Sequence, residues 1–227
     1  MRILHDNFLD DSTTVFNVNV PNTAFPIANL TSNILAERTE FDDYIVVDLG
    51  SAKNITAVAL GNESDAVTIE GNATDSWGGP SFTQLLTEDV TFINETYRYW
   101  RIYTNATDTR LGYFFLGTFL QLPPTDGQHI NAINNTDIKS FSSNGQSYNT
   151  RGIIFNTESI TFPEVTKTER DTFQTFYTSA DRANNYYIVQ FEDNISGYPP
   201  YFGTVTEYDP ARDIRSFSFN LQIREAK

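Results

Sequence analysis

The chain has 227 residues, a net charge of −14 and no cysteine. Its acidic surface repels the phosphates of nucleic acids and of anionic membranes, so we expect neither as a partner. Without cysteine the chain has no disulfides and no thiolate chemistry, and a reducing cytoplasm is its expected place of folding. The abundance of Tyr, Phe, Thr and Asn favours strands and polar turns over helices.

The first half of the chain predicts strands separated by turns. Residues 1–43 are mostly irregular in pattern, and residues 44–49 are the first convincing strand, apolar on both faces as inside a sandwich. Residues 54–60 form the next strand, and residues 66–70 alternate between apolar and polar positions. The Gly- and Pro-containing residues 71–80 then predict a polar loop.

Aromatic strands complete this half. Residues 97–103 predict a strand in which Trp100 and Ile102 lie on one face, and this alternation predicts a core position for Trp100. Residues 113–122 are the most apolar stretch of the chain. The prolines that follow end this strand, so a domain boundary is expected after residue 122.

The second half predicts further strands and one helix. Thr166 and Glu169 have the spacing of a capping box, with Thr at the N-cap and Glu at the third helical position. Three aromatic residues follow at helical spacing: Phe173, Phe176 and Tyr177. These patterns predict a helix over residues 167–178, and the strict alternation of residues 216–224 predicts a half-buried strand near the end of the chain.

Three segments of the first half resemble the discoidin or coagulation-factor C domain group, whose fold is a galactose-binding-like jelly roll. Residues 44–50 (YIVVDLG) are similar to the strand of that group that ends in Asp-Leu-Gly. Residues 55–60 (ITAVAL) resemble the following strand, and residues 97–102 (YRYWRI) its aromatic-Arg-Tyr-x-Arg-Ile strand. The cysteines usual in animal discoidin domains are absent, so the lipid and collagen ligands of those domains are not expected.

A second resemblance, to phage tail-associated proteins, extends over nearly the whole chain. Those proteins often follow the Arg-Tyr-Trp-Arg-Ile strand with a segment similar to residues 111–117 (LGYFFLG). They often begin with a stretch similar to residues 25–30 (FPIANL) and close on a strand similar to residues 221–225 (LQIRE). The resemblance implies a structural component of a virion.

Together these observations predict a mainly β fold. Residues 1–122 are expected to form an antiparallel jelly-roll β-sandwich, and residues 123–140 a linker. Residues 141–227 are expected to form a second β-rich domain that serves assembly and carries the one short helix.

Trp77 and Asp75 are the candidate ligand-binding residues. An indole in a loop with Gly and Asp is a common means of stacking on a sugar ring. The carboxylate of Asp75 could accept hydrogen bonds from sugar hydroxyls beside it. The alternative is structural, with Trp77 folded back over the edge of the sandwich or placed in a subunit contact.

Tyr198, Tyr201 and Phe202 are the candidate interface residues, because aromatic side chains are enriched where subunits meet. They belong to a segment with two adjacent prolines, residues 198–202 (YPPYF). The alternative is a tight loop that covers the core of its own domain.

The sequence predicts no catalytic residue, no cofactor and no metal. The two histidines, His5 and His129, have no neighbours that suggest nucleophilic catalysis, and there is no zinc cluster or phosphate-binding loop. Asp42 and Asp43 precede the first strand, where jelly rolls of this type can hold calcium. Calcium takes six to eight oxygen ligands, and only two carboxylates are evident.

The leading functional hypothesis is a structural component of a tailed-phage virion, at the tail tip, baseplate or collar. Such a protein would be made in the host cytoplasm and would assemble with other virion proteins in a homo- or hetero-oligomeric ring. It could also contact a glycan on the host surface. The alternative hypothesis is a carbohydrate-binding module of a secreted or surface-associated protein. Neither hypothesis makes the chain an enzyme.

Overall fold

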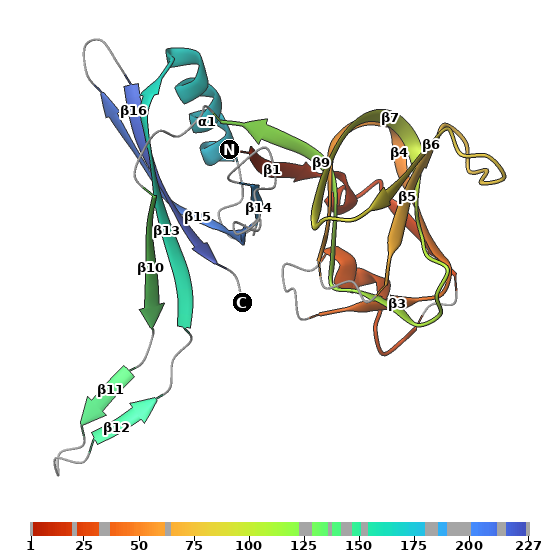
Figure 1. Cartoon of the computed structure of the whole chain (residues 1–227), viewed down its shortest axis with the longest axis horizontal. Coiled ribbons are helices and arrows are strands. Elements are labelled where there is room, and N and C mark those ends of the chain that lie inside the picture. The colour runs from red at the N-terminus through yellow and green to blue at the C-terminus, as the bar shows by residue number, and fades with distance from the viewer. Residues whose placement is uncertain are drawn as a thin grey trace. The chain divides into compact units, whose positions relative to one another are not determined.

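The computed structural model describes most of the chain, in two compact units (Figure 1). One unit consists mainly of Arg2–Gln121, and the other of Leu122–Ile188 with Tyr201–Lys227. The described residues are 2–19, 22–31, 37–61, 65–122, 129–135, 138–141, 147–150, 154–179, 186–189, 201–212 and 217–225. Side chains are described in the first four of these ranges and at residues 162 and 165–178.

The first unit is built on antiparallel strands in the order β1-β9-β4-β7-β5-β6, and β2 pairs with β4. A separate two-stranded sheet joins β3 and β8. The strands are β1 (Arg2–Asn7), β2 (Val15–Val18), β3 (Thr39–Phe41), β4 (Tyr44–Gly61), β5 (Val67–Asn72), β6 (Phe82–Leu86), β7 (Val90–Tyr103), β8 (Thr109–Leu111) and β9 (Tyr113–Gln121). Two short 3-10 helices, η1 (Phe8–Asp10) and η2 (Ile27–Thr31), lie between the early strands.

The first 43 residues, which the sequence predicts to be mostly irregular, contain three short strands that the pattern did not reveal. β1 pairs with β9, β2 with β4 and β3 with β8, each across a long sequence separation. The hydrogen bonds that make these segments strands come from distant partners, and a local pattern does not reveal them. Gly117 permits the close approach of β1 to β9. A Cβ added at Gly117 would lie 2.2 Å from the backbone oxygen of Asp6.

Strands β4 and β7 pair along most of their length and curve together, which turns one ladder into the two layers of a sandwich (Figure 1). The first half of β4 has β2 as its other neighbour, and the second half has β9. The register shifts between Asp48 and Lys53, where Gly50 adopts a left-handed conformation with φ of 72°. A glycine adopts this conformation without the steric cost that a side chain brings.

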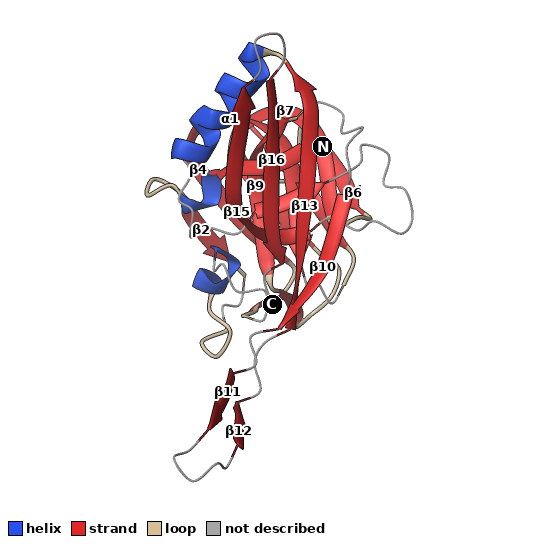
Figure 2. Ribbon diagram, turned by 90° about the vertical axis from the view of Figure 1, so that its left-hand side faces the viewer, coloured by secondary structure: helices blue, strands red, loops and turns tan. Residues whose placement is uncertain are grey.

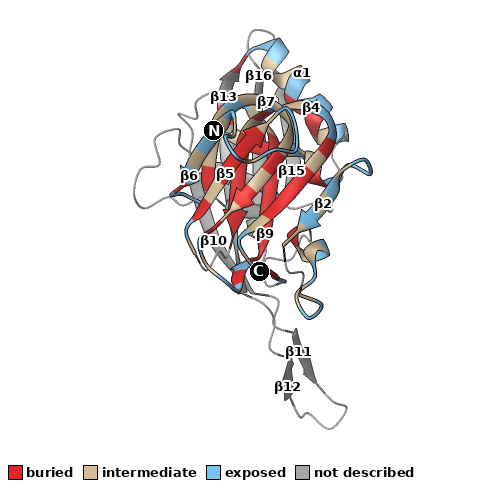
Figure 3. Ribbon diagram, turned by 90° about the vertical axis from the view of Figure 1, so that its right-hand side faces the viewer, coloured by how far each residue is buried: buried red, intermediate tan, exposed pale blue. Residues whose placement is uncertain are grey.

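The core of the sandwich surrounds Trp100, which is fully buried. Figure 3 shows buried stretches, in red, along the strands of the first unit. Its ring centroid lies 5.9 Å from that of Phe82 and 5.8 Å from that of Tyr97, with both rings edge-on. A Cβ added at Gly71 would lie 2.5 Å from the ring of Tyr97 and 3.2 Å from that of Trp100. The other side chains predicted for the core are also buried: Val47, Leu49, Val58, Ile102 and Leu116. The core position predicted for Trp100 is therefore confirmed.

The second unit is also mainly β and carries one helix (Figure 2). Its antiparallel strands follow the order β10-β13-β16-β15-β14, and β11 and β12 form a separate hairpin. The strands are β10 (His129–Asn135), β11 (Ile138–Phe141), β12 (Ser147–Thr150), β13 (Ile154–Val165), β14 (Tyr186–Val189), β15 (Tyr201–Arg212) and β16 (Phe217–Glu225). Strand β10 lies within the range predicted as a linker. The mainly β fold with antiparallel sheets and one short helix is confirmed.

The predicted helix is α1 (Lys167–Ser179), which lies against β16 and begins with the expected capping box. The backbone N–H of Glu169 donates to Thr166 Oγ1 at 3.2 Å, and the backbone N–H of Thr166 donates to Glu169 Oε2 at 2.7 Å. Phe173 and Phe176 are buried, and Tyr177 is half-buried. In the described part of the chain, no helix is both long enough and apolar enough to span a membrane.

Replacing Trp100 with Ala should lower the free energy of unfolding by about 3–5 kcal/mol, because the core cannot collapse around so large a void. Urea unfolding followed by far-UV circular dichroism measures the change. Leu85→Ala is the control, since Leu85 is 54% exposed and its truncation should change stability by no more than about 0.5 kcal/mol. Equal effects of the two substitutions would contradict the core assignment.

Removing the cap of α1 by Thr166→Ala should cost about 1 kcal/mol of stability. The matched control is Thr172→Ala at an exposed position of the same helix, which should be neutral or slightly stabilising because Ala favours helix. If Thr172→Ala lowered the free energy of unfolding as much as Thr166→Ala, the cap would make no specific contribution to stability.

The hydrogen bonds from Thr166 lower the pKa of Glu169 from its usual value. The carboxylate therefore stabilises the folded state at neutral pH, and this contribution is lost as the pH falls through the lowered pKa. The stability difference between the protein and its Glu169→Gln variant should be largest near neutral pH and should shrink in acid. Chemical denaturation at a series of pH values measures it, and a difference that grew on acidification would contradict the assignment.

Candidate functional site

The loop between β5 and β6 carries Trp77 and projects from the first unit (Figure 1). The side chain of Asn72 joins the two ends of this loop. Its Oδ1 accepts hydrogen bonds from the backbone N–H of Ala73 at 2.9 Å and from the hydroxyl of Ser81 at 3.0 Å. Its Nδ2 donates to the backbone oxygen of Ser76 at 2.6 Å. These bonds join the two ends of the loop on either side of Trp77.

Trp77 folds back toward the outer face of the sandwich. Its indole N–H donates to Asp75 Oδ1 at 2.7 Å, and its ring lies 4.8 Å from the guanidinium carbon of Arg101. A cation at this distance from an aromatic ring is attracted by the electron-rich face of the ring. The side chain of Trp77 is only half-buried in this position. A Cβ added at Gly78 or Gly79 would meet no atom within 4 Å, so the space beside Trp77 is open.

Arg101 pairs with Glu70, its direct neighbour across the β5–β7 ladder. The distance from the guanidinium to Glu70 Oε2 is 2.5 Å, and the two side chains are only 14% and 9% exposed. Two tyrosine rings also lie beside the guanidinium of Arg101, with centroids at 5.8 Å for Tyr44 and 5.1 Å for Tyr103. The hydroxyl of Tyr103 donates to Asn105 Oδ1 at 2.6 Å.

These side chains form one cluster on strands β4, β5 and β7 and the β5–β6 loop. We call it the Trp77 surface, and its members are Tyr44, Glu70, Asp75, Trp77, Arg101 and Tyr103. It combines half-buried aromatic rings with carboxylates and hydroxyls. Such a combination is suited to recognising a molecule that has both an apolar face and polar edges.

The structure brings the two predicted ligand-binding residues, Trp77 and Asp75, into direct contact. The contact with Arg101 also matches the alternative considered from the sequence, in which Trp77 folds back onto the sandwich. Sequence reasoning did not include Glu70 or the two tyrosines as site residues. The alternating pattern of their strands indicated that these side chains point outward. The pattern did not indicate which strands pair, so it could not show that the three side chains meet.

The other predicted positions are less informative. Tyr198 lies outside the described residues. Tyr201 and Phe202 begin β15, where their backbones pair with those of Ile188 and Tyr187 in β14. The assignment of these three residues to an interface stays a prediction.

Asp42 and Asp43 hold neighbouring loops together. Asp42 Oδ1 accepts a hydrogen bond from the backbone N–H of Asp108 at 2.8 Å. Asp43 Oδ2 accepts one from the side-chain amide of Asn19 at 3.1 Å. Within the described ranges, no group of three or more His, Asp or Glu side chains is arranged to hold a metal ion.

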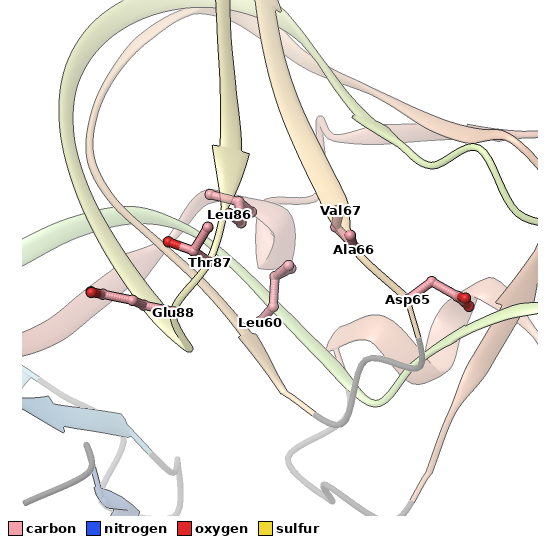
Figure 4. Close-up of a pocket in the computed structure, with 7 residues that line it drawn as sticks. All are labelled: Leu60, Asp65, Ala66, Val67, Leu86, Thr87 and Glu88. Atoms are coloured by element: carbon pink, nitrogen blue, oxygen red, sulfur yellow. The ribbon is translucent and has the colours of Figure 1, made fainter. Parts of the chain in front are cut away.

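A pocket of about 280 Å³ lies at the ends of β4, β5 and β6 (Figure 4). Its lining residues are Leu60, Asp65, Ala66, Val67, Leu86, Thr87 and Glu88. Figure 4 shows Asp65 and Glu88 at opposite ends of the pocket, with the apolar side chains between them. A binding pocket normally needs several polar groups that converge on the ligand. The Trp77 surface meets this requirement better, because carboxylates and hydroxyls lie together around its aromatic rings.

The comparisons with known proteins concern the fold. No family model matches the chain. No curated protein matches it either. Among solved structures, CpGH89CBM32-6 from Clostridium perfringens is 14% identical with a TM-score of 0.40, over 49% of this chain and 98% of that module.

Two further structures contain a bound sugar. The CBM32 of AlyQ in complex with 4,5-unsaturated mannuronic acid is 18% identical with a TM-score of 0.37, over 45% of this chain and 92% of that one. Chitosan-binding module 2 from Paenibacillus sp. IK-5, in complex with chitotriose, is 19% identical with a TM-score of 0.37. That match covers 49% of this chain and all of the module.

With TM-scores of 0.37 to 0.40, these matches establish neither a family nor a ligand for the chain. The β-sandwich of the first unit rests on its own antiparallel strand pairing. None of the three structures is a phage tail protein, and the virion hypothesis stays a prediction.

Proposed function

We propose that the chain is a non-catalytic carbohydrate-binding module that holds a sugar at the Trp77 surface. The observation that carries this proposal is the grouping of half-buried Trp77, Tyr44 and Tyr103 around the guanidinium of Arg101. A pyranose ring has apolar C–H faces and hydroxyls around its edge. It therefore matches a surface of aromatic rings bordered by hydrogen-bonding groups.

The polar groups at this surface are suited to sugar hydroxyls. Asp75 uses one carboxylate oxygen to accept from the indole of Trp77, and it is exposed. Its carboxylate has further lone pairs that can accept hydrogen bonds from a ligand. Asn105, next to the hydroxyl of Tyr103, is exposed as well and has an amide group with donors and an acceptor.

The rigidity of the surface also favours binding. Arg101, Glu70 and the two tyrosines lie on strands, and the loop that carries Trp77 is joined at its ends by Asn72. A surface that is already ordered loses little conformational entropy when a ligand binds. Glu70 is mostly buried against Arg101, a position that favours a structural role for its carboxylate over acid–base chemistry.

A glycan-binding module and a virion component are compatible functions. The proposed sugar site does not depend on the predicted tail location or on an oligomeric ring. Both remain predictions, and a mass-spectrometric census of purified virions would test the first of them.

Replacing Trp77 with Ala should weaken sugar binding at least about fivefold, because truncating a central aromatic contact typically costs more than 1 kcal/mol. A glycan array with the 227-residue chain identifies bound sugars, and isothermal titration calorimetry then measures Kd for the protein and the variant.

The matched control is Phe92→Ala. Phe92 is also a half-buried aromatic residue of β7, but it lies nine residues before Arg101 and packs against Phe119. Its truncation should leave Kd unchanged. Binding that survived Trp77→Ala but was lost in Phe92→Ala would place the site elsewhere, and an array without any bound sugar would overturn the proposal.

A further inference from the structure

We propose that the Trp77 surface selects amino sugars and neutral sugars and discriminates against sugars that carry a carboxylate or another acidic group. This inference rests on the proposed sugar-binding function and specifies its ligand class. It follows from how the charged groups at this surface are already paired within the protein.

The positive charge of Arg101 is balanced by Glu70. Both guanidinium contacts to Glu70 Oε2, from Nε and from a terminal nitrogen, measure 2.5 Å. Because both side chains are largely buried, this pair is little weakened by solvent. An acidic ligand could use Arg101 only by competing with a carboxylate that is already in place.

The other charge that contacts Trp77 among the described residues is the carboxylate of Asp75. Its Oδ1 lies 2.7 Å from the indole nitrogen of Trp77, and the residue is exposed. A sugar stacked against the indole must therefore lie close to this negative charge. An ammonium group on the sugar would be attracted to Asp75, and a carboxylate would be repelled.

The other arginine of β7 does not reverse this balance. Arg98 donates two hydrogen bonds to Asp48, at 2.7 and 2.8 Å, so its charge is also offset. Residues 1–122 have a net charge of −10, with 6 Lys and Arg against 16 Asp and Glu. The field of this region therefore adds to the repulsion of an acidic ligand.

The expected size of the effect follows from Coulomb's law. Two unit charges about 4 Å apart in water interact by about 1 kcal/mol, which corresponds to a roughly fivefold change in Kd. The interaction is screened by salt, so the discrimination should be larger at low ionic strength.

The experiment uses sugars that share a ring and differ only in charge. One series is galactosamine, galactose and galacturonic acid, and a second is glucosamine, glucose and glucuronic acid, each also offered as short oligomers. Isothermal titration calorimetry at low and at high salt should rank the amino sugar first and the acidic sugar last, with each step about fivefold at low salt. Asp75→Asn keeps an oxygen that can accept the indole N–H but removes the charge. In this variant the affinities for the amino, neutral and acidic sugars should become nearly equal.

The matched control variant is Glu88→Gln, which removes one exposed carboxylate at the pocket of Figure 4 and should leave the ranking unchanged. If acidic sugars bind most tightly, the charge inference is overturned while the sugar-binding function stands. If Glu88→Gln abolishes the ranking and Asp75→Asn does not, the site is the pocket and the inference fails. If no sugar of any charge binds, the proposed function itself fails.

Discussion

The fold of the first unit depends on the bend of β4 between Asp48 and Lys53. Here one strand leaves the layer it shares with β2 and enters the layer it shares with β9. The side chain of Asp48 secures the bend in two ways. It accepts the backbone N–H of Gly50 at 2.8 Å, and it binds Arg98 of β7 through two hydrogen bonds. The hydrogen bond from Arg98 holds the pKa of Asp48 below its usual value.

This bend explains why two of the segments similar to discoidin domains occur together. The Asp-Leu-Gly stretch supplies the carboxylate and the glycine of the bend, and the Arg-Tyr-Trp-Arg-Ile strand supplies Arg98. In the same strand Trp100 fills the core, and Arg101 lies beneath Trp77 on the outer face. Within this one strand, Arg98 therefore stabilises the bend, Trp100 fills the core and Arg101 contributes to the candidate site.

The candidate site depends in turn on the layer of the sandwich that contains the first half of β4, β5 and the end of β7. Pairing of β4 and β5 with the last third of β7 places Tyr44 opposite Tyr103 and Glu70 opposite Arg101. The β5–β6 loop then brings Trp77 against the guanidinium. Because Glu70 balances Arg101 below the indole, the exposed Asp75 is left to set the charge that a ligand meets.

The sequence by itself determined the mainly β class, the buried position of Trp100 and the capped helix α1. Each depends on the pattern of residues within one segment, and the periods of strands and helices differ enough to be recognised. Only the tertiary structure decided that β1, β2 and β3 exist, that β4 continues through its bend, and that Arg101 joins Glu70 beneath Trp77. These features depend on the register between segments far apart in the chain, and Arg101 and Glu70 are 31 residues apart. Strand register is set by the packing of whole sheet faces and by turn geometry, which a local pattern does not contain.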